Sequence, residues 1–579
     1  MRRRIHTPPA LSIFISVLLL ASFSLYLSRD VFSGEESRPS PSLFRKRFSN
    51  LPLNFAVTEN QYRHRSSHHV SSLGELSPDA ILFPDWEVLL VLSPRDSLPS
   101  DSSDGYFCLF QNNATSPARP TGFLPFHQLV TFKCVLPSSV RRLRPFYQPI
   151  LTKSPEYYWL GNDSGSPELL RWSHLAYESL STENDVVLFA KGVNQRRDRS
   201  RPPSELRCVF GDDATKAVRT EVTISSQEVF RCRHPDEASL RRLFNGRDDE
   251  RIKISLEVRQ QKKVTVVPSL AYYSGPRKVT SEKGKSLVCA CTMVYNVAKF
   301  LKEWVIYHSK IGVDKFILYD NGSDDGLEKV VEQLLLQGYD VKTLLWPWPK
   351  TQEAGFSHCA VYARDSCTWM MYVDVDEFVF SPSWLKSLHP SPDMLKSLLP
   401  LPRTSHGSSS SSSGLPIAQI MMRCLDFGPS NQTSHPIQGV TQGYTCRRKM
   451  EQRHKSIVLL EAVDTTLINV VHHFQLREGY RGKRLTRGEG VVNHYKYQAW
   501  SEFKAKFRRR VSAYVVDWRQ ESNPMSQDRT PGLGFAPIEP KGWATKFCEV
   551  NDSRLKVATQ RWFRFGLDSP TGYKMAWQD

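Results

Sequence analysis

The sequence predicts an α/β domain built on a Rossmann-like, mainly parallel sheet, preceded by a β-sandwich-like domain and one apolar helix. Two strand–helix units predict the sheet, one over 286–308 and the next beginning at 315–325. Short alternating runs between turns, from about 82 to 260, predict the β-rich domain. The uncharged apolar and small residues of 11–27 predict the helix, because this length is close to what a membrane span needs.

Composition places the chain among folded proteins with anionic partners. Its 579 residues suffice for two or three domains, and 40% hydrophobic with 23% charged residues is ordinary for folded chains. The net charge of +18 suits nucleic acid, a membrane surface or anionic small substrates. No RNA-binding motif, zinc-finger spacing or basic heptad helix occurs. We therefore expect a nucleotide diphosphate and an acidic polysaccharide as partners, and no nucleic acid.

The N-terminal region predicts a membrane anchor and a stem. Three arginines at 2–4 precede the apolar segment 11–27, so residues 1–10 are expected in the cytosol and everything after the span in the lumen. The alternative is a cleaved signal peptide, although no Ala-x-Ala-like cleavage site follows. Residues 28–80, rich in Ser, Arg and Pro, predict a flexible stem.

The β-rich domain, 81–280, contains two pairs of cysteines with similar spacing. Cys108 and Cys134 are 26 residues apart, Cys208 and Cys232 are 24 apart, and each pair joins two expected strands. In a secretory compartment this spacing favours two disulfides, and buried free thiols are the alternative. The domain has no clustered carboxylates or histidines, so we expect it to bind or pack rather than catalyse.

A pair of aspartates follows the most apolar strand of the α/β domain. Residues 369–373 are expected as a buried strand, and Asp374 and Asp376 come at its carboxyl end. Side chains at i and i+2 of a strand share a face, so both carboxylates are expected to project together where ligands of α/β sheets bind. Two hard oxygen donors suit Mg²⁺ or Mn²⁺ with free positions for phosphates. The alternative is an acidic turn without a metal.

Two other polar positions belong to the first half of this sheet. Asp320 ends the strand 315–319, and an acidic residue there suits hydrogen bonds to a ribose or base. A plain Asn-Gly turn is the alternative. His308 falls on the apolar face of the helix after the first strand, so we expect it to be a hydrogen-bonded packing residue.

Several surface features are expected in the lumen. The serine-rich insertion at 404–415 predicts a disordered loop without chemistry. Glycosylation is expected at Asn113, Asn162, Asn431 and Asn551, each of which starts an Asn-x-Ser/Thr site. Asn321 also starts such a site, but a glycan beside Asp320 would block the expected nucleotide turn, so we expect it to be unmodified.

Residues 286 to about 515 resemble the glycosyltransferase family 92 domain, a family that includes plant β-1,4-galactan synthases. The matching motifs, in order, are Asn296 with 300–308 and Gly312, then 319–325, 352–359, Trp369, 374–378, 427–430, 455–458 and 494–496. The resemblance implies a GT-A fold, with the catalytic domain over 281–560 and a C-terminal tail over 561–579. It also implies a Golgi type II membrane enzyme. The implied activity is inverting transfer of a sugar, commonly galactose, from a UDP-sugar with Mn²⁺ or Mg²⁺. The β-rich domain more loosely resembles the carbohydrate-binding module of galactan synthases.

The resemblance also suggests roles for individual residues. His494 resembles the C-terminal metal ligand of GT-A enzymes, beside Asp374 and Asp376, and Asn296 joins the expected nucleotide-sugar site. Lys455 could add positive charge at the β-phosphate, with a surface lysine as the alternative. Apart from the resemblance, inversion requires a base opposite the leaving group, and the candidates are Asp426 and Glu461, with Asp426 ahead because it lies between Arg423 and Phe427.

Two other functional classes are the alternatives to a glycosyltransferase. A non-catalytic carbohydrate-binding membrane protein of the secretory pathway would keep the β-rich domain but would not need Asp320, Asp376 and His494 together. A metal-dependent phosphodiester hydrolase would call for more clustered carboxylates and histidines. The sequence does not decide the donor sugar, the acceptor such as pectic β-1,4-galactan, or the linkage, and it leaves a homodimer open.

Overall fold

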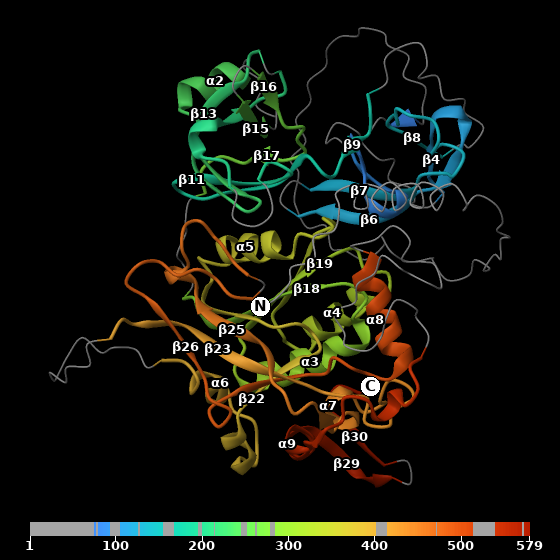
Figure 1. Ribbon diagram of the computed structural model, residues 1–579, viewed down its shortest axis with the longest axis vertical. Coiled ribbons are helices and arrows are strands. Elements are labelled where there is room, and N and C mark those ends of the chain that lie inside the picture. Colours follow the sequence, from blue (N-terminus) through green and yellow to red (C-terminus); the bar gives the residue numbers. More distant parts are fainter. Residues whose placement is uncertain are drawn as a thin grey trace, which may run out of the picture. The chain divides into compact units, whose positions relative to one another are not determined.

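Two β modules precede the α/β domain in the computed structural model (Figure 1). The structure describes residues 75–76, 79–92, 105–125, 128–153, 167–194, 200–213, 215–244, 252–260, 263–277, 284–400, 414–470, 472–512, 539–569 and 572–578. The predicted span at 11–27, Asn162 and nearly all of the predicted serine-rich loop lie outside these ranges. Among the helices that are described, none has the length and apolar character needed to cross a membrane.

The first β module is a sandwich of two antiparallel-rich sheets, with strand orders β1-β8-β4-β5 and β6-β7-β3-β2-β9. Its strands are β1 (Glu75–Leu76), β2 (Asp79–Leu82), β3 (Glu87–Val91), β4 (Phe107–Leu109), β5 (Thr115–Pro117), β6 (Arg119–Leu124), β7 (Leu129–Val135), β8 (Ile150–Thr152) and β9 (Leu170–Arg171). Apolar side chains of both sheets form one core, and the Cys108–Cys134 disulfide joins β4 to β7 inside it. The module begins at Glu75, inside the segment predicted as stem.

The second β module is one sheet folded around its own core, ordered β10-β11-β14-β13-β12-β15-β16, with β17 beside β15. Its elements are β10 (Leu175–Ser181), β11 (Asp185–Lys191), β12 (Leu206–Phe210), β13 (Val218–Ser226), β14 (Val229–Arg233), α2 (Glu237–Phe244), β15 (Ile252–Gln260), β16 (Lys263–Val266) and β17 (Tyr272–Tyr273). Cys208 on β12 bonds to Cys232 on β14. Both disulfides are the pairings that the spacing predicts, but the single predicted sandwich is two modules, each with its own core.

The α/β domain has a nine-stranded mixed sheet, ordered β20-β19-β18-β21-β25-β23-β27-β22, with β26 beside β23. Neighbours from β20 to β21 are parallel, and β25 runs antiparallel to β21. The elements of its first half are β18 (Ser286–Val294), α3 (Ala298–Ile311), β19 (Lys315–Asp320), α4 (Leu327–Leu336), β20 (Val341–Leu345), α5 (Gln352–Tyr362), β21 (Cys367–Tyr372), β22 (Glu377–Phe380) and α6 (Asp393–Lys396).

The second half supplies the remaining strands of the sheet and the helices that follow them. Its elements are β23 (Ile417–Asp426), α7 (Val440–Gly443), β24 (Cys446–Arg447), β25 (Gln452–Leu459), β26 (Arg481–Arg484), β27 (Val491–His494), α8 (Trp500–Ser512), β28 (Val550–Asn551), α9 (Arg554–Phe563), β29 (Arg564–Ser569) and β30 (Gly572–Met575). Residues 561–579 were predicted as a tail. Instead Phe563, Met575 and Trp577 are buried in the main core, because three large apolar side chains remove considerable surface from water there.

The two faces of the sheet are covered by different helices. Side chains alternate along β18, so Ala290 faces a core that contains α3 and α4, whereas Cys289 and Cys291 face α5. Cys291 is bonded to Cys359 of α5, and Cys289 to Cys367 of β21. Sequence spacing did not reveal these two bonds, because their partners lie 78 and 68 residues away and meet only when the sheet forms.

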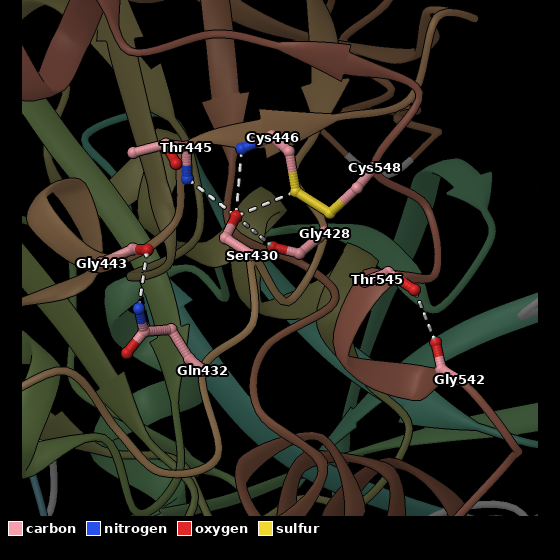
Figure 2. Close-up of a disulfide and its surroundings, with 9 residues drawn as sticks. All are labelled: Gly428, Ser430, Gln432, Gly443, Thr445, Cys446, Gly542, Thr545 and Cys548. Atoms are coloured by element: carbon pink, nitrogen blue, oxygen red, sulfur yellow. Dashed lines mark hydrogen bonds between the residues drawn. A yellow bond between two sulfur atoms is a disulfide. The ribbon is translucent and has the colours of Figure 1, made fainter.

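A fifth disulfide, Cys446–Cys548, ties the short strand β24 to the segment before β28 (Figure 2). Ser430 supports the turn beside it, because its hydroxyl oxygen accepts hydrogen bonds from the amides of Thr445 and Cys446 at 2.8 and 3.0 Å (Figure 2). Cys424 is the remaining cysteine and is buried as a free thiol. The Cys446–Cys548 bond therefore joins the segments that carry β24 and β28, which pair as a separate two-stranded sheet.

The β modules share a buried aromatic cluster with the α/β domain. Trp172, just after β9, stacks on Trp348 with ring centroids 5.6 Å apart, and its indole N–H donates to the carbonyl of Pro349. Tyr177 of β10 packs against both Trp172 and Trp348. Aromatic rings bury large apolar areas, so this cluster is the main apolar contact between the modules and the sheet.

Candidate active site

The predicted aspartate pair lies in a turn rather than in a strand. β21 ends at Tyr372, and Asp374 and Asp376 belong to the reverse turn that leads into β22. The turn is closed by the Glu377 amide, which donates to the Asp374 carbonyl, and by the Asp374 amide, which donates to a Glu377 carboxylate oxygen at 2.8 Å. The strand periodicity used to place both aspartates on one face therefore does not apply. Glu377, which received no role from the sequence, is fully buried beneath them.

Lys455 is the cation that balances the first aspartate. Its ammonium lies 2.8 Å from Asp374 and 2.9 Å from Glu377, and it donates to His472 Nε2 at 2.6 Å. Burial alone would raise the pKa of Asp374, but Lys455 and His472 lower it to about 2. Burial would also lower the pKa of Lys455, yet the two carboxylates raise it, so the ammonium stays charged. Only 7% of Lys455 is exposed, which excludes the surface-lysine alternative.

His494 and Lys506 lie beside the second aspartate. His494 Nε2 is 3.5 Å from Asp376, and the Lys506 ammonium of α8 donates to the same carboxylate. Burial favours a neutral imidazole, but Asp376 and Glu377 outweigh it and raise the pKa of His494 to about 9. Lys506 and His494 hold the pKa of Asp376 well below its usual range in spite of its burial. The second aspartate is therefore ionised and surrounded by cations.

Asp426 lies at the Nδ1 side of the His494 ring, whereas Asp376 lies at the Nε2 side. Its carboxylate is 1% exposed, 3.1 Å from His494 Nδ1, and it accepts from the Lys496 ammonium at 3.3 Å. A base must lie within hydrogen-bond reach of the hydroxyl that it deprotonates. The geometry instead suits a residue that orients the imidazole, since ligand histidines are commonly held by a carboxylate on the second ring nitrogen. The structure therefore encloses Asp426 between His494 and Lys496, a position that does not suit the base predicted from the sequence.

Glu461 does not belong to this site. β25 runs antiparallel to β21, with Ser456 opposite Tyr372 and Leu459 opposite Trp369. Glu461, in the short 3₁₀ segment after β25, is therefore about 16 Å further along, towards the opposite edge of the sheet. It is exposed there. The structure therefore places Glu461, the second candidate base, away from the aspartate turn, and sequence order could not show this because it does not reveal which way a strand runs.

Asp320 and Asn296 lie at the same edge of the sheet as the aspartate turn, since β18 pairs in parallel with both β19 and β21. We call residues 320–325 the nucleotide turn. Asp320 accepts from the amide and the hydroxyl of Ser323, and Asn296 Nδ2 donates to Asp324 at 2.7 Å. Burial raises the pKa of Asp320. The Asn-Gly segment is thus a turn, as the alternative stated, and it also presents Asp320 at the edge where nucleotides bind in such sheets.

The structure also describes His308, Asn321 and three of the Asn-x-Ser/Thr sites. His308 is a packing residue as expected: it is buried, bonded to the Trp304 carbonyl at 2.9 Å, and its pKa is lowered by burial to about 3. The Asn321 side-chain amide donates to the Trp346 carbonyl at 2.8 Å. Three of the expected glycosylation sites are exposed: Asn113, Asn431 and Asn551.

Sequence reasoning missed four members of the site: Glu377, His472, Lys496 and Lys506. Lys496 lies in the motif 494–496 and Glu377 in 374–378, so both could have been found there. His472 had a weaker signal as part of a His-His pair, and its backbone has a φ of +73°, an unusual value for a non-glycine residue that often marks a functional site. Lys506 had no sequence signal that could have revealed it, because it is one of many basic residues on α8.

The side chains of Asp374, Asp376 and His494 are of the types that bind divalent cations. Carboxylate oxygens and a neutral imidazole nitrogen suit Mn²⁺, but a bound ion would have to displace the Lys506 ammonium from Asp376 and a proton from His494. In the part of the chain that the structure describes, however, no three His, Cys, Asp or Glu side chains are arranged to hold an ion together. The predicted trio is divided, because His494 reaches Asp376 while Asp374 is bonded to Lys455.

A cavity of about 340 Å³ lies elsewhere, lined by Leu425, Arg447, Arg487, Val491, Asn551, Asp552, Ser553 and Arg554. Leu425 and Asp426 are neighbours on β23, so their side chains point to opposite faces of the sheet. Arg447 and Arg554 both bond to Asp552, at 2.7 and 2.6 Å, so these arginines already have an anionic partner. The cavity is therefore separate from the aspartate turn.

Solved structures overlap only weakly with this chain. A mannosyltransferase from Pyrobaculum calidifontis, in complex with GDP-Man and Mn²⁺, has a TM-score of 0.24 and 9% identity over 41% of this chain and 66% of its own. Glucosyl-3-phosphoglycerate synthase from Mycobacterium tuberculosis has a TM-score of 0.18 and 14% identity over 32% and 60%. Overlaps this small do not define the fold, which rests on the strand order above.

Sequence comparison is more specific. The family model for glycosyltransferase family 92 matches residues 284–530. A family 92 protein of Ricinus communis is 37% identical over all of this chain and 98% of its own length. Family 92 proteins of rice and Arabidopsis thaliana are 43% and 41% identical over 68% and 70% of this chain, and over 67% and 69% of theirs. With similarity of this extent, and with the matched residues holding the aspartate turn and its cations, the chain belongs to glycosyltransferase family 92.

Proposed function

We propose that this glycosyltransferase has a GT-A fold and transfers a hexose, with galactose as the favoured donor sugar, from a UDP-sugar to an oligosaccharide or polysaccharide such as pectic β-1,4-galactan. One observation carries the proposal. Four carboxylates, those of Asp374, Asp376, Glu377 and Asp426, are collected at the carboxyl edge of the sheet and are balanced by three lysines and His494. This edge also carries the nucleotide turn.

Different residues of the site are proposed to bind the nucleoside and the diphosphate of the sugar donor. Asp320 can accept hydrogen bonds from a ribose hydroxyl or a base N–H at the nucleotide turn. Lys455 is held rigidly by Asp374 and Glu377, so its charge is preorganised for the leaving diphosphate. Asp426 holds Nδ1 of His494, which leaves Nε2 directed at Asp376. Asp376 and His494 would hold Mn²⁺, which would supply a Lewis acid for the diphosphate, while Asp374 is bonded to Lys455.

An assay of the purified protein with Mn²⁺, a panel of UDP-sugars and pectic oligosaccharide acceptors tests the proposal. We expect stoichiometric release of UDP and elongation of the acceptor with UDP-galactose, loss of both on chelation, and recovery when Mn²⁺ is restored. Equal transfer with and without Mn²⁺ would refute the metal requirement. Binding of the oligosaccharide without turnover of any donor would favour the non-catalytic carbohydrate-binding alternative.

We further propose that the chain is a single-pass type II protein of the Golgi membrane with a lumenal catalytic domain. The proposal rests on the arginines at 2–4 before the apolar segment 11–27. In sealed Golgi vesicles, residues 284–579 should resist added protease until detergent is present. Digestion of this region without detergent would reverse the orientation.

A further inference from the structure

Lys133 of the first β module faces the nucleotide turn of the α/β domain. On β7, Phe132 and Cys134 point into the core of the sandwich, so Lys133 points out of it. Its ammonium lies 3.3 Å from the point that a Cβ atom would occupy on Gly322, in the middle of the nucleotide turn. Beside it, the Arg119 guanidinium lies 3.8 Å from the Asp324 carboxylate. Two cations of this β module therefore reach the same turn.

Arg119 and Lys133 differ in their exposure and in their charged partners. Arg119 is largely exposed, at 68%, and forms a surface ion pair. Lys133 is largely enclosed, and the described residues give it neither a hydrogen bond nor an ion pair for its ammonium. Burial is the main cause that lowers the pKa of Lys133; the Arg119 guanidinium lowers it further, and the carboxylates of Glu87, Asp320 and Asp324 raise it. Enclosing an ammonium without a partner is costly, and lysine is rarely placed this way unless something else pairs with it.

We propose that Lys133 is a donor-binding residue: its ammonium bonds to an oxygen of the nucleoside, on the base or the ribose, when a nucleoside diphosphate lies against Asp320. This inference rests on the proposed function. The nucleoside is favoured over the phosphates because Lys133 lies against Gly322 of the nucleotide turn, whereas Lys455 is held at Asp374, where the diphosphate is proposed to bind. The first β module would then complete the donor site as well as contact carbohydrate, and donor binding would depend on how this module is docked.

Nucleotide binding to the full chain, measured by calorimetry with Mn²⁺, tests the assignment. Lys133→Met keeps the apolar stem and removes the charge. A hydrogen bond from a charged donor is worth about 1.5–3 kcal/mol, so UMP and UDP should both bind at least about tenfold more weakly. Lys133→Arg should restore most of the affinity. Arg142 is an exposed arginine of the same module and gives the matched control: Arg142→Met should change either affinity less than about twofold.

Unchanged affinity of Lys133→Met for UMP and UDP would overturn the assignment, and so would a loss seen with UDP but not with UMP, because that pattern indicates phosphate contact. If Lys133→Met does not fold, the wild-type chain can be labelled with an amine-acylating reagent and mapped by mass spectrometry. UDP should then slow acylation of Lys133, and equal labelling with and without UDP would refute the contact. A wild-type chain that binds no UDP would instead refute the proposed function itself.

Discussion

Replacing Asp376 with Asn should lower the rate of sugar transfer at least about 100-fold, or about 2.7 kcal/mol, the usual cost of removing one electrostatic stabiliser of a transition state. The substitution preserves size but removes a carboxylate charge that His494 and Lys506 now balance. Mn²⁺ would lose a charged ligand. His494 and Lys506 would lose the carboxylate that they share. Steady-state rates and UDP-sugar affinity, measured over a range of Mn²⁺ concentrations, report the loss.

Asp393→Asn is the matched control. Asp393 is an exposed aspartate on α6 whose partner, Lys396, lies 3.4 Å away, so its loss should change rate and stability little. Asp376→Asn should also lose stability, because His494 and Lys506 lose the carboxylate that they share, so the melting temperature is measured to establish that the assayed protein is folded. If the folded Asp376→Asn protein transfers sugar at nearly the wild-type rate, Asp376 neither holds the metal nor balances the donor.

Replacing Lys455 with Met should destabilise the fold by about 3–5 kcal/mol at pH 7, the range for removing one partner of a buried ion pair. Asp374 and Glu377 would be left close together without their shared cation, and Glu377 is completely buried. Donor binding should fall as well, because the fixed charge for the diphosphate is gone. Urea denaturation followed by fluorescence gives the change in stability, and calorimetry with UDP gives the change in affinity.

Lys483→Met provides the comparison for this large effect. Lys483 on β26 pairs with Glu489 at 2.7 Å, but both side chains are about 40% exposed, so the pair should contribute less than about 1 kcal/mol. Similar losses of stability from Lys455→Met and Lys483→Met would contradict the buried network at Asp374. Arginine at position 455 should recover only part of the stability, since the guanidinium is larger than the enclosed space around the ammonium.

Local patterns in the sequence predicted helices and strands of the α/β domain and the position of the site in it. Strand and helix periodicity predicted the alternation from β18 to β21, and the aspartate pair marked the carboxyl edge of the sheet. The spacing of Cys108 from Cys134 and of Cys208 from Cys232 predicted two disulfides, because each bond joins strands that are close in sequence. These features depend on residues within about 30 positions of one another, so composition and order reveal them directly.

Only the tertiary structure decided which side chains meet. Lys455 reaches Asp374 across 81 residues because β25 pairs with β21, and the same antiparallel pairing moves Glu461 away from the site. Asp426 approaches His494 because β23 and β27 are parallel neighbours, which makes it a support for the imidazole and buries it from any acceptor. The physical reason is that contacts between distant residues depend on strand order and direction. Those are determined by how the whole core packs, and no local pattern in the chain encodes them.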